Sequence, residues 1–258
     1  MDERMIVLSI INLKGGVSKT ISAINIAHIM AEEFGKRVLL IDNDKQGNTT
    51  KFFKLHDEDA PSISDVLTVK GFHIRDAAKE TRYKNLHVIP SNMSLLNADK
   101  QILMDCARPQ QTRLKKALAE VANDYDFVVI DNAPNLDMSV NNALVASDHV
   151  LIPIKIDQFA FDGVAEILYQ IDELKEFNEH LRVVGGFVTM YQHTRVNREG
   201  TQILQNGGML PMLETKIRRS TIIDETTFAG IPVAEYTPRS MVTKDFKQLV
   251  SEYLELCQ

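Results

Sequence analysis

The sequence predicts an α/β fold with a doubly wound, mostly parallel β-sheet that has helices on both faces. Apolar runs rich in β-branched residues predict buried strands, and stretches with a helical spacing of apolar residues separate them. The expected strands are residues 5–11, 38–41, 86–89, 126–131, 150–156 and 182–190. Strands that alternate with helices usually form a parallel sheet between two helical layers. A chain of 258 residues with 44% hydrophobic residues is large enough to bury the core of such a domain.

The first expected strand runs into a glycine-containing loop, residues 11–20, with the sequence Ile-Asn-Leu-Lys-Gly-Gly-Val-Ser-Lys-Thr. A helix is expected directly after it, because apolar residues recur on one face at Ile24, Ala27, Ala31 and Phe34. Strand, loop and helix in this order form the context of a phosphate-binding P-loop. Gly15 and Gly16 allow the backbone to approach a phosphate, toward which the helix N-terminus directs partial positive charge. Lys19 adds a full charge, and the Thr20 hydroxyl suits Mg²⁺.

Position 18 departs from the usual P-loop pattern, which has glycine before the lysine. Ser18 precedes Lys19 here, and an additional lysine, Lys14, stands at the start of the loop. A serine with φ above zero would cost roughly 1 kcal/mol at this position. We expect an ordinary right-handed helical conformation instead, in which the Ser18 hydroxyl donates a hydrogen bond to the phosphate. A glycine turn that binds nothing would not explain two lysines and a threonine at this spacing.

The second expected strand ends in two carboxylates, Asp42 and Asp44. Side chains at i and i+2 on an extended chain point the same way, so both can face the phosphate site. Ligands of doubly wound sheets bind at the carboxyl ends of the strands, which is where these residues lie. A polar turn would explain the glycine and asparagine that follow, Gly47 and Asn48, but not two aspartates in phase.

The segment between the second and fourth expected strands gives weaker signals. Ser62 is a candidate N-cap, and two short helices are expected before about Lys79. Residues 93–123 are expected to be helical, with a break at Pro109 that divides them into two helices. These helices are expected to cover the sheet.

The fourth expected strand, residues 126–131, ends in a single carboxylate, Asp131. A carboxylate in this place can orient a water molecule bound to Mg²⁺. Later in the chain a helix is expected at 164–174, and a final helix has Phe246, Leu249, Val250, Tyr253 and Leu254 on one face.

Charge and cysteine content limit the classes of function. A net charge of −6 argues against a chain that is basic all over, although it allows a local basic face. Cys106 and Cys257 lie far apart and form neither a disulfide framework nor a zinc motif, which fits a reducing cytoplasm. The start of the chain lacks a signal-peptide pattern, and no apolar run approaches the length of a membrane span.

These motifs resemble those of the ParA/MinD family of deviant Walker A ATPases, and most closely those of short ParA/Soj-type partition proteins. Loop 11–20 resembles the deviant Walker A box, with Lys14 as its signature lysine. Residues 42–48 resemble the family's D-x-D-P-Q-G-N box, although Lys45 replaces the proline, and Asp131 ends a Walker B strand. The resemblance extends over residues 5–254 and implies one ATPase domain, residues 1–258, without an N-terminal helix-turn-helix domain.

The resemblance also implies cofactors and roles, namely ATP and Mg²⁺ bound at the loop. Lys14 would cross a dimer interface to the other subunit's nucleotide, Lys19 would stabilise the developing charge, and Asp44 would orient the attacking water. The metal ion would be held or supported by Thr20, Asp42 and Asp131. The nucleotide would contact Lys14, Gly15, Gly16, Val17, Ser18, Lys19, Thr20, Ile21, Met190, Arg218 and Ser220.

The C-terminal third carries a local excess of positive charge, at Arg195, Arg198, Lys216, Arg218, Arg219, Arg239, Lys244 and Lys247. An ordinary solvated surface would account for these residues. The resemblance implies instead a DNA-backbone patch assembled across a dimer, with Arg195 and Arg219 as contacts. The match to the family is partial here, because Arg218 and Ser220 replace a proline and an asparagine, and Ile222 replaces an arginine.

We therefore expect a bacterial, cytoplasmic and nucleoid-associated ATPase that segregates a plasmid, a chromosome or a mobile element. ATP would join two subunits into a homodimer, the dimer would bind double-stranded DNA nonspecifically, and a ParB-like partner would stimulate hydrolysis. No membrane binding is expected.

Three alternatives remain open. A nucleotide-binding adaptor that hardly hydrolyses ATP is suggested by Ser18. A MinD-like membrane switch needs a basic amphipathic tail, whereas the tail here mixes Lys244 and Lys247 with Glu252 and Glu255. An iron–sulfur reductase needs two cysteines per subunit at a dimer axis, and neither cysteine of this chain follows a strand of the phosphate site.

Overall fold

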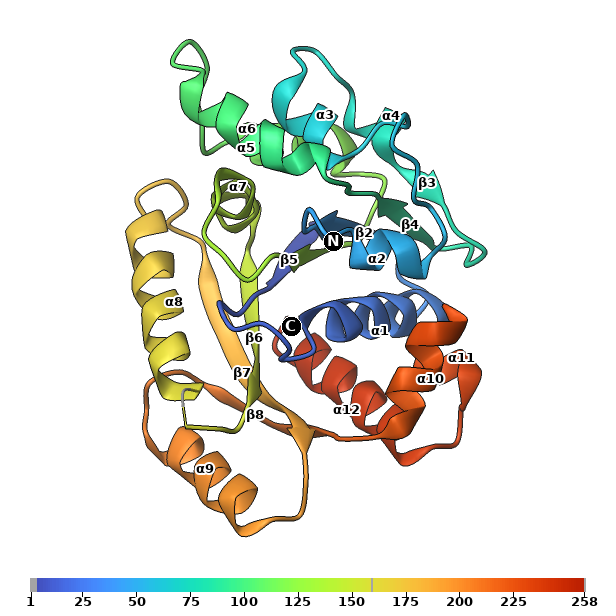
Figure 1. Cartoon of the computed structure of the whole chain (residues 1–258), viewed down its shortest axis with the longest axis vertical. Helices are drawn as coiled ribbons and strands as arrows, with labels where there is room; N and C mark the ends of the chain where they lie inside the picture. Colours follow the sequence, from blue (N-terminus) through green and yellow to red (C-terminus); the bar gives the residue numbers. More distant parts are fainter. Residues whose placement is uncertain (1–3, 159, 258) are drawn as a thin grey trace.

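In the part of the chain that the computed structural model describes, residues 4–158 and 160–257, eight strands form one sheet (Figure 1). Their order across the sheet is β3-β4-β2-β5-β1-β6-β7-β8, and neighbours run parallel except for β3 and β4. The strands are β1 (Ile6–Ile10), β2 (Val38–Asn43), β3 (Lys79–Glu80), β4 (Leu86–Ile89), β5 (Phe127–Asn132), β6 (His149–Lys155), β7 (Arg182–Tyr191) and β8 (Met212–Arg218). This architecture confirms the predicted doubly wound α/β fold.

The helices cover both faces of the sheet, with α1, α10, α11 and α12 on one side and α7 and α8 on the other (Figure 1). The helices in the first half are α1 (Lys19–Glu32), α2 (Asn48–Phe52), α3 (Ile63–Thr68), α4 (Ile74–Ala77), α5 (Ser94–Met104) and α6 (Arg113–Leu118), followed by the 3₁₀ turn η1 (Ala119–Val121). Those in the second half are α7 (Met138–Ala146), α8 (Ala160–Leu174), α9 (Arg195–Asn206), α10 (Thr221–Ala229), α11 (Val233–Tyr236) and α12 (Met241–Glu255). None of the described helices is long and apolar enough to cross a membrane.

Successive side chains of the central strands point to opposite faces of the sheet, so the core consists of separate apolar layers. On β1, Leu8 and Ile10 pack with α1 and α12, whereas Val7 packs with α3, α5 and α6 on the opposite face. A third cluster joins β6 to α7 and α8 through Ile152 and Ile154. Because both faces are covered, these strands are apolar throughout, which is why their sequences contain no alternation of polar and apolar residues.

Two predictions about the middle and the second half of the chain are wrong. Three short helices, α2 to α4, precede Lys79 where two were expected. Strand β8 was not expected at all, because Glu214 and Lys216 interrupt its apolar residues. Its buried residues, Leu213, Thr215 and Ile217, alternate with the more exposed ones, which is the pattern of an edge strand covered on one face.

The predicted apolar face of the first helix wrongly includes Phe34. Helix α1 ends at Glu32, so Phe34 lies beyond it and is 41% exposed. Gly35 follows with φ of 62°, a left-handed conformation that suits a glycine just after a helix. The predicted N-cap is confirmed, since Ser62 and Asp65 form a reciprocal capping box at the start of α3.

The register of the sheet brings the predicted motifs to one edge. Ile10 on β1 and Asp42 on β2 both pair with Asp131 on the strand between them, β5. The loops that follow β1, β2 and β5 therefore leave the sheet side by side at its carboxyl edge.

Candidate functional site: the loop between β1 and α1

The loop before α1 closes through two residues in left-handed conformations, Gly16 with φ of 71° and Ser18 with φ of 68°. The expected right-handed conformation of Ser18 is therefore wrong. Ser18 is the N-cap of α1, where the chain must turn from the loop into the helix, and its carbonyl accepts a hydrogen bond from Ser22 N at 2.9 Å. Its side chain caps no backbone group in the described part of the chain. Ser18 therefore adopts a left-handed backbone conformation that glycine adopts without strain, and this lowers the stability of the protein by about 1 kcal/mol.

Lys19 is the first residue of α1 and is only 8% exposed. Its ammonium group donates a hydrogen bond to the carbonyl oxygen of Lys14 at 3.0 Å, so the side chain curves back over the loop. Burial lowers the pKa of Lys19, and the Asp131 and Asp44 carboxylates act in the opposite direction. The first turn of α1 thus places a buried cation next to two acids.

Lys14, the expected signature lysine, forms an ion pair with Asp157, which follows β6 in the same chain. The backbone of the loop is fixed beside it, because Lys14 N donates to Asn12 Oδ1 at 2.9 Å and Asn12 Nδ2 donates to the Pro153 carbonyl at 2.9 Å. Asp157 is a site residue that the sequence analysis missed. A carboxylate directly after a parallel strand is the signal that points to it, as it did for Asp42 and Asp131.

Asp42 and Asp131 are the buried acids of the site. Asp42 Oδ2 accepts hydrogen bonds from the backbone N and hydroxyl of Thr50 at 2.8 and 2.6 Å, and its Oδ1 accepts one from Asp44 N at 3.2 Å. Asp131 Oδ2 accepts one from the Thr49 hydroxyl at 2.8 Å, whereas Asp131 Oδ1 is buried without a hydrogen-bond partner among the described residues. Burial raises the pKa of both carboxyl groups, and the charge of Asp131 adds to the shift of Asp42.

The orphaned oxygen of Asp131 identifies the group that best fits a metal ion. The described residues contain no cluster of three or more His, Cys, Asp or Glu side chains that could hold a metal alone. Mg²⁺ needs no such cluster, since it commonly keeps water and binds through one carboxylate plus the phosphates of a ligand. Asp131 and the Thr20 hydroxyl fit that donor set. Asp42, with donors already on both of its oxygens, fits a supporting position behind Asp131.

Asp44 lies in the loop after β2 and is partly exposed. Its Oδ1 accepts a hydrogen bond from Gln46 N at 2.9 Å, and its carbonyl accepts one from Gly47 N at 2.8 Å. Gly47 has φ of 62°, and a Cβ there would lie 2.7 Å from the Ser91 carbonyl, so the turn requires glycine. Lys45, at the family's proline position, pairs with Asp137 at 3.9 Å.

Comparisons with known proteins agree with this geometry. A family model described as an AAA domain matches residues 5–183. The sporulation initiation inhibitor protein Soj of Bacillus subtilis is 32% identical over 250 residues, which cover 95% of this chain and 97% of that protein. The chromosome partitioning protein ParA of Myxococcus xanthus is 28% identical over 252 residues, which cover 96% of this chain and 88% of that protein. The chain belongs to the ParA/MinD family of deviant Walker A ATPases.

A solved structure with a bound nucleotide is also similar. The cobyrinic acid a,c-diamide synthase of Mycobacterium smegmatis with bound ADP and magnesium has a TM-score of 0.84 at 27% identity, and the match covers 97% of this chain and 94% of that one. The chain is thus a ParA/Soj-like member of a family of partitioning ATPases, whose structural relatives bind nucleotides together with magnesium.

The residues expected around the nucleotide base of this ParA/MinD-family chain lie together at the ends of β7 and β8. Met190 has φ of 51°, and its neighbour Tyr191 pairs with Arg218 across the two strands. The Arg218 guanidinium donates two hydrogen bonds to Asp245, at 2.7 and 2.8 Å. Ser220 caps α10 by accepting a hydrogen bond from Ile222 N at 3.3 Å. Arg218 and Ser220 thus have structural roles in addition to any contact with a nucleotide.

The two expected DNA contacts differ in their surroundings. Arg195 is highly exposed but pairs with Glu199 one turn along α9, at 2.6 Å. Arg219 has an exposed side chain with no ion pair to a described residue, and its backbone N donates to the Tyr191 carbonyl at 3.0 Å. Of the two, Arg219 is therefore the better placed to bind a phosphate.

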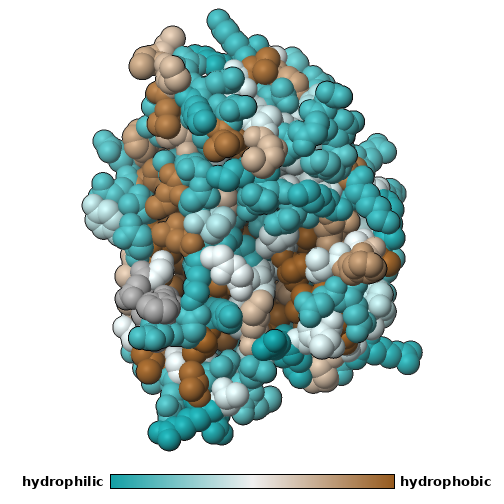
Figure 2. Space-filling view, in the orientation of Figure 1, coloured by the Kyte–Doolittle hydropathy of each residue, from teal (hydrophilic) through white to brown (hydrophobic). Residues whose placement is uncertain are grey.

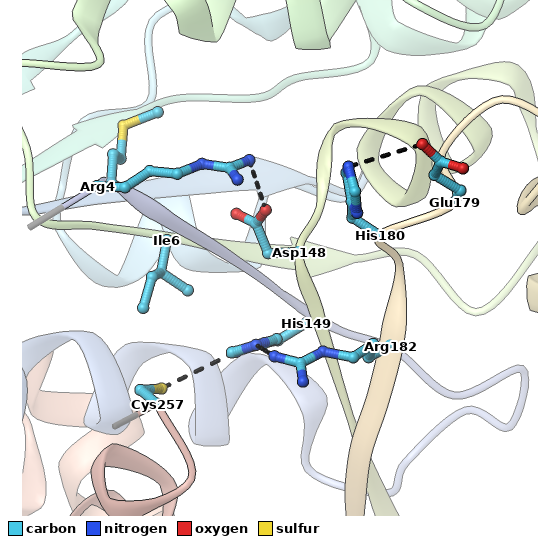
Figure 3. A pocket seen from close by; sticks show the side chains of 9 residues that line it. Arg4, Ile6, Asp148, His149, Glu179, His180, Arg182 and Cys257 are labelled. Atoms are coloured by element: carbon cyan, nitrogen blue, oxygen red, sulfur yellow. Dashed lines mark hydrogen bonds and ion pairs between the residues drawn. The ribbon is translucent and has the colours of Figure 1, made fainter.

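A cavity of about 430 Å³ lies at the amino ends of β1, β6 and β7, which is the edge opposite the P-loop (Figure 3). Several of its side chains contact one another: Arg4 forms an ion pair with Asp148 at 3.0 Å, and the His180 ring lies 3.9 Å from the Glu179 carboxylate. Arg182 donates to His149 at 2.9 Å. This cavity lies at the opposite edge of the sheet from the loop between β1 and α1.

Proposed function

We propose that the chain is an ATP-dependent DNA-partitioning ATPase that dimerises on ATP–Mg²⁺. One observation carries the proposal: buried Lys19 lies next to Asp131, whose Oδ1 lacks a partner among the described residues. A buried cation and an unsatisfied carboxylate oxygen at a helix N-terminus suit a nucleotide phosphate and its metal ion. A fold that bound nothing here would leave this buried carboxylate oxygen without a hydrogen-bond partner among the described residues.

The proposed chemistry is in-line attack of water on the γ-phosphate. Bound Mg²⁺ would neutralise charge on the phosphates, with Asp131 and Thr20 as its holders and Asp42 as support. Lys19 would stabilise the charge that develops on the transferred group, and Asp44 would orient the water. Both residues lie close enough to the Asp131 carboxyl to act on its pKa, which Asp44 raises and Lys19 lowers, and this proximity supports their roles.

Dimerisation is proposed to redirect Lys14. In the single chain its ammonium pairs with Asp157, which follows β6. Both side chains of this pair are partly exposed. In the dimer, Lys14 would contact the partner subunit's nucleotide and add charge to its phosphates.

The proposed DNA contact is nonspecific and centred on Arg219, with Arg195 as a weaker contributor because of its pair with Glu199. A ParB-like partner protein would then stimulate hydrolysis. Salt-sensitive binding that ignores base sequence is the behaviour expected of arginine contacts to backbone phosphates.

A second function, a nucleotide-binding adaptor that hardly hydrolyses ATP, is favoured by Ser18. Its left-handed conformation places a Cβ and a hydroxyl in a loop that must enclose phosphates. A MinD-like membrane switch has less support, because the apolar residues of α12, including Phe246, Leu249 and Tyr253, are buried in the core. An iron–sulfur reductase has less support too, since Cys257 lies by the cavity at the opposite edge of the sheet.

ATP turnover measured with and without double-stranded DNA tests the proposal against the adaptor. A Mg²⁺-dependent turnover that is lost in Asp44→Ala, while calorimetry still detects ATP binding, supports the partitioning ATPase. Tight ATP binding with no turnover in any condition supports the adaptor instead.

A further inference from the structure

Helix α5 has an apolar face that is directed away from the core. Four large apolar side chains, Met93, Leu96, Leu103 and Met104, are exposed, and Met104 is 83% exposed. With the helical repeat they fall on one stripe, roughly 16 Å long, opposite the buried residues of the helix. Apolar surface is visible at the top of Figure 2, over the region where Figure 1 places α3, α5 and α6.

Lys100 occupies the middle of the stripe, four residues after Leu96 and three before Leu103. It is exposed and has no ion pair with any residue in the described ranges. A cation surrounded by leucine and methionine side chains complements a helix that carries an acid among apolar residues.

Helix α5 is also connected to the carboxylates of the ATP site. In the segment just before α5, Ser91 N donates to the Thr50 hydroxyl at 2.8 Å, and that hydroxyl donates to Asp42 at 2.6 Å. In the middle of α5, Asp99 accepts a hydrogen bond at 2.7 Å from the backbone N of Ser139, in the first turn of α7. The Ser139 carbonyl in turn accepts from Asn43 Nδ2 at 3.1 Å, one residue after Asp42.

We propose that the exposed stripe of α5 is the docking face for an acidic amphipathic helix of a partner protein. The apolar face of that helix packs on Met93, Leu96, Leu103 and Met104, and one of its carboxylates pairs with Lys100. A few exposed side chains on one helix suit a weak, transient contact rather than a permanent assembly. A docked helix would change the hydrogen bonds of Ser91 and Asp99, which connect α5 to the turn formed by Asp42–Asp44. The inference rests on the proposed function in one respect, namely that this turn controls the rate of ATP turnover.

The test uses the full-length protein in its native host, with photoreactive benzoylphenylalanine in place of Leu103. The same group in place of Phe228 is the matched control, because Phe228 is 98% exposed on α10. The expected adduct is a segment of another protein with acidic and apolar residues at helical spacing. No adduct above that of the control, a basic segment, or a second copy of this chain would overturn the proposal.

A synthetic peptide with the sequence of the captured segment completes the test. Leu103→Ser and Lys100→Glu should each weaken its binding at least tenfold in calorimetry, whereas Phe228→Ser should leave it unchanged. The peptide should alter the rate of ATP turnover by the unmodified protein but not by Leu103→Ser. ATP affinity should be the same in all variants, so a failure of docking is distinct from a failure of the ATP site. Equal peptide affinity in Leu103→Ser and the unmodified protein contradicts the assignment.

Discussion

Asp42 on β2 and Asp131 on β5 occupy paired positions in the sheet, and both side chains are buried. The two acids differ in their partners, since Asp42 accepts three hydrogen bonds from its own chain while one oxygen of Asp131 accepts none from a described residue. Two neighbouring buried carboxylates repel each other and raise each other's pKa. A cation bound beside these two carboxylates would therefore reduce the repulsion between them.

Lys19→Ala should abolish ATP binding, because it removes the buried ammonium group beside Asp131. Calorimetry with ATP–Mg²⁺ is the measurement. Lys115→Ala, which changes an exposed lysine on α6, should keep the affinity of the unmodified protein. An unchanged affinity in Lys19→Ala would refute the assignment of the loop as a phosphate site.

Ser18→Gly should stabilise the protein by about 1 kcal/mol relative to Ser18→Ala, since glycine alone adopts the left-handed conformation without strain. The Ser18 side chain makes no capping hydrogen bond within the described residues, so little is lost with it. Urea denaturation of the three proteins without nucleotide measures the difference. Equal midpoints for glycine and alanine would show that position 18 is not strained.

His28 should make stability depend on pH. It is buried against Tyr83, with ring centroids 4.5 Å apart, and its Nδ1 has no hydrogen-bond partner in the described part of the chain. Burial lowers the pKa of His28 from 6.5 to about 4. Because the folded-state pKa is the lower one, the stabilisation is complete above pH 6.5 and is lost as the pH falls toward 4.

His28→Phe should remove this contribution, which amounts to at most about 1.4 kcal/mol per pH unit. Free energies of unfolding at several pH values between 7 and 4, with each variant compared to the unmodified protein, measure it. His180→Gln, at an exposed position, is the control. Parallel curves for His28→Phe and the unmodified protein would contradict a neutral, buried His28.

Arg219→Ala should weaken binding of the ATP-bound protein to DNA and make its salt dependence shallower. Each phosphate contact contributes about −0.9 to the slope of log affinity against log salt concentration. Fluorescence anisotropy with two unrelated duplexes measures slope and sequence preference together. Arg4→Ala, at the opposite edge of the sheet, should change neither. If Arg219→Ala leaves affinity and slope unchanged, Arg219 makes no phosphate contact.

The sequence was sufficient to predict the carboxyl edge of the sheet. Buried parallel strands have continuous apolar sequences, and the polar residues that end them, such as Asp42 and Asp131, mark where ligands bind. Strand β8 was missed because buried and more exposed residues alternate along an edge strand that is covered on one face. Such an alternation over a few residues, with Glu214 and Lys216 among them, is a weak signal in a sequence.

Features that depend on tertiary structure could not be predicted from local patterns. The left-handed conformation of Ser18 is set by the path from the loop into α1, and serine by itself favours the opposite. The pair between Lys14 and Asp157 joins residues 143 positions apart. The hydrogen bonds from α5 to the Asp42 turn, through Ser91 and Thr50, likewise exist only in the folded chain.

We propose that ATP joins two subunits through Lys14 and that Asp44 acts only afterwards, in hydrolysis. Light scattering with excess ATP–Mg²⁺ on the unmodified protein, Lys14→Ala and Asp44→Ala separates the two roles. Asp44→Ala should form a stable dimer, because its water is no longer oriented, whereas Lys14→Ala should remain a monomer although it still binds ATP in calorimetry. The same mass for both variants would show that Lys14 does not join the subunits.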